Sequence, residues 1–312
     1  MALTRAVGIP EPGGPEVLRV IDREVREPGA GEVRLAVRAG GVNPTDLGLR
    51  AQGAAGIDPP WVPGMDAAGT IESVGTGVDH LAAGDEVMAV VLPRRPEGGA
   101  QAGLVVVPAA SVVPIPAGAT FEQAATLPMN GLTAFRGLEL LGLAPGATLA
   151  VTGGAGLLAS YVIPLARSQG LRVLADAKPE DRALVERFGA EVVPRGDGLV
   201  EALLEAAPGG VDAVYDTAHL GRSIFPAIRP GGALAYVRTW DGEEVEGGVR
   251  IEPVRVAEVL ERTAWLRELA ERAGAGELEL RVAATFAPEQ AADAHRLMAA
   301  GGLRGRAVIV FG

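Results

Sequence analysis

The sequence has no cysteine among its 312 residues and only three histidines. A chain without cysteine forms no disulfide and no thiolate zinc site, and it carries no cysteine nucleophile. The histidines, His80, His219 and His295, lie far apart along the chain. Only His219, which follows a predicted strand, is placed where it can reach a ligand cleft. The composition therefore excludes several common forms of metal and covalent chemistry.

Basic residues are also scarce. Lysine and arginine number 28 against 39 acidic residues, which gives a formal net charge of −11. Such a balance argues against nucleic acid or an anionic membrane surface as the main partner. The hydrophobic content of 48% with 21% charged residues is typical of a soluble globular protein, and the length suits about two domains. The N-terminal residues lack the apolar segment of a signal peptide, so we expect a cytoplasmic protein.

One long stretch, residues 140–166, has no charged side chain. Its length would allow a membrane span. However, Pro145, Pro164 and several glycines interrupt it, and no basic cluster flanks it. We therefore predict that the stretch is buried inside a folded domain and that the protein has no membrane partner.

Within this stretch, Thr148–Ala166 organises the predicted fold. The apolar run Leu149–Thr152 predicts a buried parallel strand, and an apolar helix follows the glycine turn. The spacing Gly153-x-x-Gly156-x-x-Ala159 is a variant of the dinucleotide fingerprint, in which a helix N-terminus receives a pyrophosphate. The alternative is a plain glycine turn. The residues predicted to bind the pyrophosphate are Thr152, Gly153, Gly154, Ala155, Gly156 and Leu157.

Further strands and helices alternate after this motif, which predicts right-handed crossovers and a doubly wound parallel sheet. Asp176 ends the strand Leu171–Ala175, about where a dinucleotide-binding unit places the carboxylate that binds the adenosine ribose. Asp216 and Thr217 end the next-but-one strand, and Trp240 follows a later one. Ligands bind at this edge of open α/β sheets, so all three are candidate cofactor contacts.

The first 117 residues differ from this pattern. Short alternating segments such as Glu32–Gly40 and Asp85–Val91, bounded by glycine and proline, predict an antiparallel β-rich unit. Residues 118–256 form the predicted nucleotide unit. The tail from residue 257 holds a helix and then a strand, a helix and a strand, and by pattern alone it can complete either unit.

Together these segments resemble the medium-chain dehydrogenase/reductases, in particular their zinc-free quinone oxidoreductase branch. The segments that carry the resemblance are EPGGPEVL (11–18), GVNPTD (41–46), PGMDAAGTIESVGTGV (63–78), GDEV (84–87), LPMNGLTAF (127–135), TGGAGLLAS (152–160) and GRAVIVF (305–311). The resemblance implies an α/β fold with a β-rich part: a GroES-like β-barrel catalytic domain at residues 1–117 and 257–312, and a Rossmann domain at 118–256.

Zinc-dependent members of this superfamily carry a cysteine ligand near the GVNPTD position, a Gly-His-Glu motif and a four-cysteine lobe. Here the corresponding residues are Asn43 and Gly64-Met65-Asp66, and the lobe is absent. Zinc is usually held by three or four thiolates, imidazoles or carboxylates together, which Asp66 alone does not supply. We therefore predict no catalytic zinc.

The resemblance also implies roles for polar residues beside the cofactor. Asn43 and Asp46 are candidate catalytic residues in the GVNPTD loop, with an Asx turn and a helix cap as the structural alternatives. Asn130 and Thr133 belong to the segment that passes the nicotinamide ribose in this family. We assign cofactor binding to Asn130 and catalysis to Thr133, with a turn and a helix cap as alternatives.

The sequence leaves the choice of cofactor open. Asp176 favours NADH, because a carboxylate accepts from a ribose 2′-hydroxyl and repels a 2′-phosphate. Most zinc-free relatives prefer NADPH, and Lys178 or Arg195 can meet a phosphate. The alternative for both basic residues is simple solvation on the surface.

The expected reaction is hydride transfer from NADH or NADPH to a small apolar quinone or to a carbon–carbon double bond conjugated to a carbonyl. The tyrosines and the glutamate that often shape this cleft in relatives are missing at residues 98–104, which leaves the acceptor open. Two alternatives are a cyclase or isomerase on the same scaffold and a nucleotide-binding protein without turnover. Relatives are commonly homodimers that pair edge strands of the nucleotide unit. The apolar strand Ala233–Val237 can serve as such an edge, but a strand covered on both sides has the same pattern.

Overall fold

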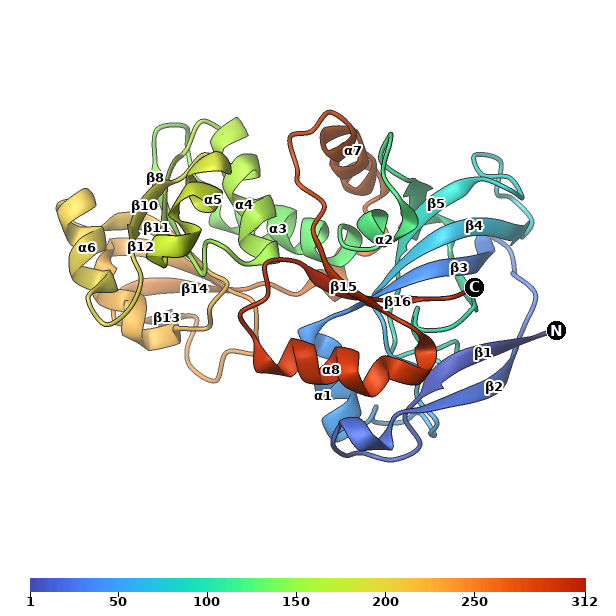
Figure 1. Cartoon of the computed structure of the whole chain (residues 1–312). Helices are drawn as coiled ribbons and strands as arrows, with labels where there is room; N and C mark the ends of the chain where they lie inside the picture. The colour runs from blue at the N-terminus through green and yellow to red at the C-terminus, as the bar shows by residue number, and fades with distance from the viewer. The chain divides into compact units, whose positions relative to one another are not determined.

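The computed structural model describes all residues, 1–312, and divides the chain into two compact units (Figure 1). Unit 1 comprises Met1–Met129 and Leu260–Gly312, and unit 2 comprises Asn130–Val259. The boundaries lie at Asn130 and Leu260 rather than at residues 118 and 257. The short helix α2 (Phe121–Ala124) explains the first difference, because it packs on strands of unit 1.

Unit 1 is built on a seven-stranded sheet, accompanied by a two-stranded one. Apart from the parallel pair β15–β16, the pairing is antiparallel. The order in the large sheet is β15 (Val282–Phe286), β16 (Arg306–Val310), β3 (Glu32–Val42), β4 (Asp66–Val74), β5 (Glu86–Val90) and β7 (Val112–Pro114), with β6 (Leu104–Pro108) paired to β3; β1 (Ala2–Gly8) and β2 (Arg19–Val25) form the small sheet.

The helices of unit 1 cover this sheet. They are α1 (Pro44–Gln52), α2, α7 (Thr263–Gly274) and α8 (Ala291–Ala300), with 3₁₀ turns η1 (Pro15–Val17), η2 (Ala109–Ser111) and η6 (Pro288–Gln290). Val33, Leu35 and Val37 of β3 lie in the core. The tail from β15 to β16 belongs to unit 1, and β16 pairs with β3 through Ala307 to Val310.

Unit 2 is a second seven-stranded sheet, parallel except for its last strand. Its order is β10 (Glu191–Pro194), β9 (Arg172–Ala177), β8 (Thr148–Thr152), β11 (Val211–Asp216), β12 (Ile228–Tyr236), β14 (Val249–Pro253) and β13 (Val245–Glu246). Numbered within the unit, the parallel strands run 3-2-1-4-5-6, the order of the Rossmann fold. The doubly wound parallel sheet predicted from the sequence is confirmed.

Helices connect these strands. They are α3 (Pro128–Leu141), α4 (Leu157–Ser168), α5 (Arg182–Arg187) and α6 (Leu199–Ala206), with 3₁₀ turns η3 (Pro179–Asp181), η4 (Gly221–Ala227) and η5 (Val256–Glu258). The uncharged stretch 140–166 is thus divided among the end of α3, strand β8, a turn and α4. No helix of the structure combines the length and the apolar character needed to cross a membrane.

Of the two possibilities for Ala233–Val237, an edge for dimerisation or a covered strand, the structure shows the covered one. Strand β12 lies between β11 and β14 with both sides hydrogen-bonded. The covering strand β14 and the strand β13 beyond it were not predicted, because Val245–Pro253 is short and rich in charge and glycine. The edges of this sheet are β10 and β13.

Candidate functional site

The candidate residues of unit 2 meet at the carboxyl ends of β8 and β11, where the strand order reverses. The connection from β8 leads to β9 on one side, and β11 lies on the other. A crevice for ligands forms at this switch point in open α/β sheets. The sequence therefore places its glycine turn at the edge where such sheets bind nucleotides.

Thr152, Asp216 and Thr217 are hydrogen-bonded to one another at this edge. The Thr152 hydroxyl donates to Asp216 Oδ1 at 2.6 Å, and the Thr217 hydroxyl donates to the Thr152 carbonyl at 2.5 Å. The other carboxylate oxygen of Asp216 accepts from the Gly221 backbone N–H at 2.8 Å. Thr152 and Asp216 are buried, whereas Thr217 is half-buried. Of the three, Thr217 is the one whose side chain remains accessible to a ligand.

Two glycines of the turn are required by its geometry. Gly153 has φ +67°, a conformation that glycine adopts without strain. A Cβ at Gly154 would lie 2.8 Å from the Asp176 carbonyl oxygen, closer than real Cβ atoms approach backbone. Gly156 is the N-cap of α4, so the first N–H groups of that helix point to the crevice edge. Gly153 and Gly156 are half-buried, whereas Ala155 and Leu157 are buried.

Asp176 has a structural role that the sequence did not reveal. One oxygen of its carboxylate accepts a hydrogen bond from the Gly153 N–H, and its backbone carbonyl accepts from the Gly154 N–H at 3.1 Å. The side chain is only 3% exposed, and burial raises the pKa of Asp176 above its ordinary value. The carboxylate therefore holds the glycine turn, and its binding of a ribose remains a prediction.

Basic side chains lie beside Asp176 at the ends of β9 and β10. Arg195 Nε is 3.6 Å from the second carboxylate oxygen of Asp176, and its side chain is 48% exposed. Lys178 is exposed and lies 3.9 Å from a carboxylate oxygen of Glu180. This corner of unit 2 therefore presents Arg195 and Lys178 to solvent, with the exposed Glu180 beside Lys178, while the Asp176 carboxylate faces the turn.

Asn130 and Thr133 lie one helical turn apart on α3 and are both buried. The position of α3 against the sheet is fixed by Tyr215 of β11, whose hydroxyl donates to the Thr133 carbonyl at 2.5 Å. Gly137 leaves room for that ring. The cofactor and catalytic roles predicted for Asn130 and Thr133 remain predictions.

Trp240 is part of an aromatic cluster beyond the end of β12. Its ring lies edge-on to Tyr236 with centroids 5.1 Å apart, and the Arg222 guanidinium lies 4.6 Å above the indole. His219, the one non-glycine residue with positive φ, lies edge-on to Tyr236 at 6.0 Å. Two buried polar atoms here, His219 Nδ1 and Trp240 Nε1, have no hydrogen-bond partner. Sequence analysis did not identify Tyr236 and Arg222, whose only signal was proximity to strand ends.

In unit 1, Asn43 and Asp46 form the N-terminal cap of α1. The Asp46 carboxylate accepts from the Asn43 N–H at 2.7 Å and from the Gly64 N–H at 2.8 Å. The Asn43 side-chain amide donates to Asp66 Oδ2 at 2.6 Å, and Asp66 Oδ1 accepts from the Met129 N–H at 2.6 Å. These groups are buried, and the capping alternative considered for Asp46 is what the structure shows.

Burial strongly affects both carboxylates of this network. Desolvation raises the pKa of Asp46 to about 7 and that of Asp66 to about 6. Hydrogen bonds from backbone N–H groups and the positive charge of Arg306 act in the opposite direction and offset part of the effect. The catalytic roles predicted for Asn43 and Asp46 remain predictions.

The same residues occupy the positions that the resemblance assigns to catalytic zinc, and they do not fit that metal. Asn43 offers an amide that already donates to Asp66, and Met65 stands where the ligand histidine is expected. No group of three or more His, Asp or Glu side chains converges anywhere in the structure.

Two family models match the chain. The alcohol dehydrogenase GroES-like domain matches residues 29–117, and the zinc-binding dehydrogenase model matches residues 188–309. An alcohol dehydrogenase of Geobacillus stearothermophilus is 32% identical over 69% of this chain and 73% of its own length. A quinone oxidoreductase of Rattus norvegicus is 35% identical over 69% of this chain and 66% of its own.

The chain spans only part of some relatives. It covers 54% of a 2-methylene-furan-3-one reductase of Solanum lycopersicum, at 30% identity over 66% of this chain. It covers 6% of the pikromycin polyketide synthase component PikAII of Streptomyces venezuelae, at 32% identity over 78% of this chain.

Solved structures agree with this relationship. An NAD-dependent alcohol dehydrogenase superposes with a TM-score of 0.85 at 27% identity, covering 99% of this chain and 100% of its own. A mycobacterial protein complexed with NADPH gives 0.84 at 26% identity, covering 98% and 100%. The chain therefore belongs to the medium-chain dehydrogenase/reductase family, in its quinone oxidoreductase-like branch.

Proposed function

We propose that the chain is a zinc-independent reductase that uses NADH or NADPH to reduce a quinone or a carbon–carbon double bond conjugated to a carbonyl. The observation that carries this proposal is the glycine turn at the β8–β11 switch point, held open by Asp176 and followed by the N-terminus of α4. The names of the relatives, a quinone oxidoreductase and a 2-methylene-furan-3-one reductase, support the choice of acceptor.

A bound reduced nicotinamide supplies the hydride in such a reaction. The chain's own contribution is position and electrostatics. The N–H groups at the start of α4 bind a pyrophosphate, and Gly154 keeps side-chain atoms away from it. Trp240 Nε1 and His219 Nδ1 are buried at the neighbouring strand end, and neither has a hydrogen-bond partner within the protein.

Gly154→Ala tests the cofactor site. The added Cβ would lie 2.8 Å from the Asp176 carbonyl oxygen and 3.0 Å from the Ala175 Cβ, so the turn must shift. We expect the dissociation constant for NADPH to rise by about tenfold or more, since 1.4 kcal/mol of misfit corresponds to tenfold. The control is Gly146→Ala, whose Cβ meets nothing within 4 Å although its φ of +89° adds local strain. Unchanged affinity in Gly154→Ala, measured by titration calorimetry, would contradict the proposal.

We further propose that NADPH is preferred to NADH. The support is the orientation of Asp176, whose carboxylate is buried against the turn and faces Arg195, while Arg195 and Lys178 are exposed. A guanidinium beside this corner favours a 2′-phosphate, which carries two charges.

Arg195→Ala tests this preference. We expect the variant to bind NADPH about tenfold more weakly and to leave NADH binding within about twofold, because only NADPH carries the phosphate. Arg187→Ala, on the neighbouring helix α5, is the control for lost positive charge. Equal weakening of both coenzymes would show that Arg195 acts on the fold of the turn rather than on the phosphate.

Consumption of the reduced coenzyme distinguishes the reductase from a cyclase or isomerase on this scaffold. With a panel of quinones and enones, a reductase lowers the absorbance of the reduced nicotinamide in step with product. Product formed without that loss would favour a reaction with no net hydride transfer.

A further inference from the structure

Unit 1 contains a hollow that involves none of the candidate residues described above. Its volume is about 350 Å³, within the range of small-molecule sites. We call it the Arg23 hollow. Strand β2 borders it together with residues 57–62 and 93–98, and its walls include Ile21, Arg23, Ile57, Trp61, Val62 and Pro93.

Arg23 is unusual among the arginines of this chain. It is half-buried, yet its guanidinium makes no hydrogen bond or ion pair with the protein, and burial lowers its pKa. Arg38, Arg238 and Arg267 also lack partners, but those three are exposed to water. A cation removed from water without a partner costs free energy, which a bound anion would offset.

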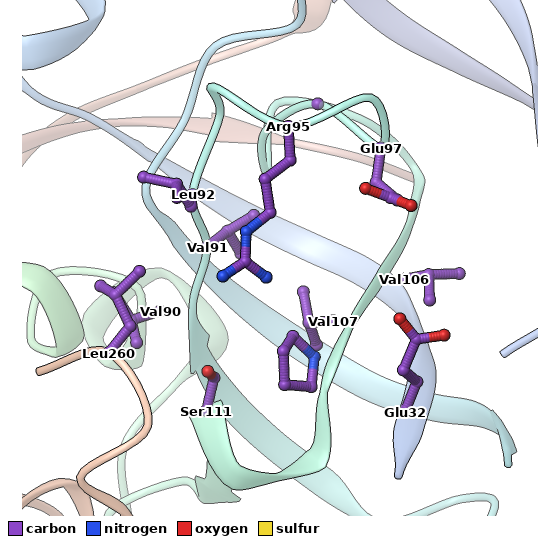
Figure 2. A pocket seen from close by; sticks show the side chains of 12 residues that line it. Glu32, Val90, Val91, Leu92, Arg95, Glu97, Val106, Val107, Ser111 and Leu260 are labelled. Carbon is purple, nitrogen blue, oxygen red and sulfur yellow. The ribbon is translucent and has the colours of Figure 1, made fainter. Parts of the chain in front are cut away.

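Arg95 shares both properties, being half-buried and unpaired, and it borders the same hollow. Figure 2 shows that its side chain points instead into a neighbouring pocket, toward Val91 and Val107. That pocket has a volume of about 20 Å³, which is room for little more than a water molecule. Arg95 therefore adds positive charge beside the Arg23 hollow without occupying it.

No carboxylate near the hollow forms an ion pair with Arg23. The charge of Glu97 partly offsets the effect of burial on the pKa of Arg23, but its carboxylate accepts hydrogen bonds from Arg26 at 2.9 and 3.2 Å. Asp22, Glu24 and Asp58 also border the hollow, and all three are exposed to water. Alternation along β2 directs the side chains of Asp22 and Glu24 to the face opposite Arg23. Ile21, on the face of Arg23, packs against the buried cluster of Ala6, Val62 and Ala102.

One part of the remaining wall is apolar. The indole N–H of Trp61 already donates to the Ile57 carbonyl at 2.7 Å, so this ring offers its apolar surface rather than a donor. Ile57, Val62 and Pro93 add aliphatic surface. The hollow thus places one unsatisfied guanidinium beside an apolar part of its wall.

We propose that the Arg23 hollow binds a small organic carboxylate with an aromatic or branched apolar body, whose carboxylate pairs with Arg23 and whose body lies against Trp61 and Ile57. A guanidinium suits a carboxylate through two parallel hydrogen bonds. This site goes beyond the proposed reductase activity, because every residue that forms it belongs to unit 1 and none holds the nucleotide turn.

Benzoate is the probe, and its neutral isostere benzamide is the first comparison. Binding to the full chain is measured by the line broadening of the ring protons and by the change in tryptophan fluorescence. We expect benzoate to bind about tenfold or more tightly than benzamide, because only benzoate pairs with Arg23. We expect inorganic phosphate, a charge without an apolar body, to bind at least about tenfold more weakly than benzoate. Equal affinity in either comparison would overturn the proposal.

Arg23→Met keeps an unbranched apolar side chain and removes the charge. It should weaken benzoate binding by about tenfold or more, whereas Arg38→Met, the same change at an exposed arginine, should leave it within about twofold. Arg23→Lys, which retains the charge, should restore part of the affinity. Unchanged binding in Arg23→Met, or an equal loss in Arg38→Met, would contradict the assignment. The ligand comparison uses the unmodified chain, so it decides the question even if Arg23→Met does not fold.

Discussion

Among single side chains, the buried carboxylates of unit 1 have the clearest consequence for stability. The Asp46 carboxylate accepts hydrogen bonds from the N–H of Asn43, at the start of α1, and from the N–H of Gly64. Desolvation nevertheless raises its pKa to about 7. The folded protein therefore holds this proton more tightly than the unfolded chain does. The stabilisation that results is complete below about pH 4 and is lost as the pH rises through about 7.

Asp46→Asn removes this titration. We expect the loss of unfolding free energy caused by the substitution to be about 2 kcal/mol smaller at pH 8 than at pH 5. The reason is that the unsubstituted protein must ionise a buried acid between these pH values, whereas the variant has no acid at this position. Urea unfolding at both pH values measures the difference. The groups that face Asp46 are Asp66 and Arg306, and both are unchanged in the variant.

Asp79→Asn, at an exposed turn, is the control for loss of a surface charge. A cost of Asp46→Asn that is the same at pH 5 and pH 8 would show that the carboxylate is already ionised at the lower pH. Asp66, whose charge also acts on Asp46, is a second carboxylate of this kind: its pKa is raised to about 6, and its oxygens accept from Asn43 and Met129.

At the scale of helices and strands, α3 packs closely against Tyr215 of β11. A Cβ at Gly137 would lie 2.3 Å from a ring carbon of Tyr215, which is fully buried and hydrogen-bonded to Thr133. We expect Gly137→Ala to destabilise the protein by about 1–3 kcal/mol, the usual cost of overpacking.

Gly48→Ala is the matched substitution in another helix. Gly48 lies in the middle of α1 with nothing within 4 Å of an added Cβ, so alanine should stabilise the chain by about 0.5–1 kcal/mol. Urea unfolding compares the two variants. A stabilising Gly137→Ala would mean that α3 moves away from Tyr215 without cost.

Patterns of hydrophobicity and glycine were sufficient to predict most strands of both units but not every helix. Helix α1 was anticipated only through the helix cap considered at Asp46 and its extent was not predicted, because PTDLGLRAQ contains a central glycine and little helical periodicity. Helix α3 lies in an apolar segment with glycines at positions 131 and 137, where a buried helix and a buried strand have the same pattern.

The position of the site was predictable to the level of strand ends. Thr152, Asp216 and Thr217 meet as expected, because parallel strands place their carboxyl ends at one edge. The direction of the Asp176 side chain was not predictable, since it depends on a hydrogen bond to Gly153, 23 positions away. Local patterns contain no information on such bonds between distant residues.

At the scale of the whole molecule, the fold of unit 1 depends on two segments that are far apart in the sequence, Met1–Met129 and Leu260–Gly312. Strand β16 lies between β15 and β3, and Ala307, Val308 and Ile309 are fully buried there. A chain that stops at Gly305 should lose the folded unit 1, because burying Val308, Ile309 and Phe311 contributes about 1.5–3 kcal/mol each, in total comparable to the stability of a domain.

Hydrogen exchange measures this effect at the amides of β3, which lose the partner strand Ala307–Val310 in the truncated chain. The control is a chain that ends at Phe311 and lacks only Gly312, around which nothing lies within 4 Å of an added Cβ. Protected β3 amides in the chain that ends at Gly305 would refute the dependence.

The late position of β16 also sets an order on biosynthesis. A ribosome releases every strand of unit 2 before residue 260, whereas the large sheet of unit 1 must wait for residues 306–310. Until then the nascent polypeptide carries Ala39 and Val42 of β3 beside an unfilled position in the sheet. During translation, unit 2 therefore has its full set of strands before unit 1 does. We expect the part of unit 1 that is made first, Met1–Met129, to be the segment that needs a chaperone.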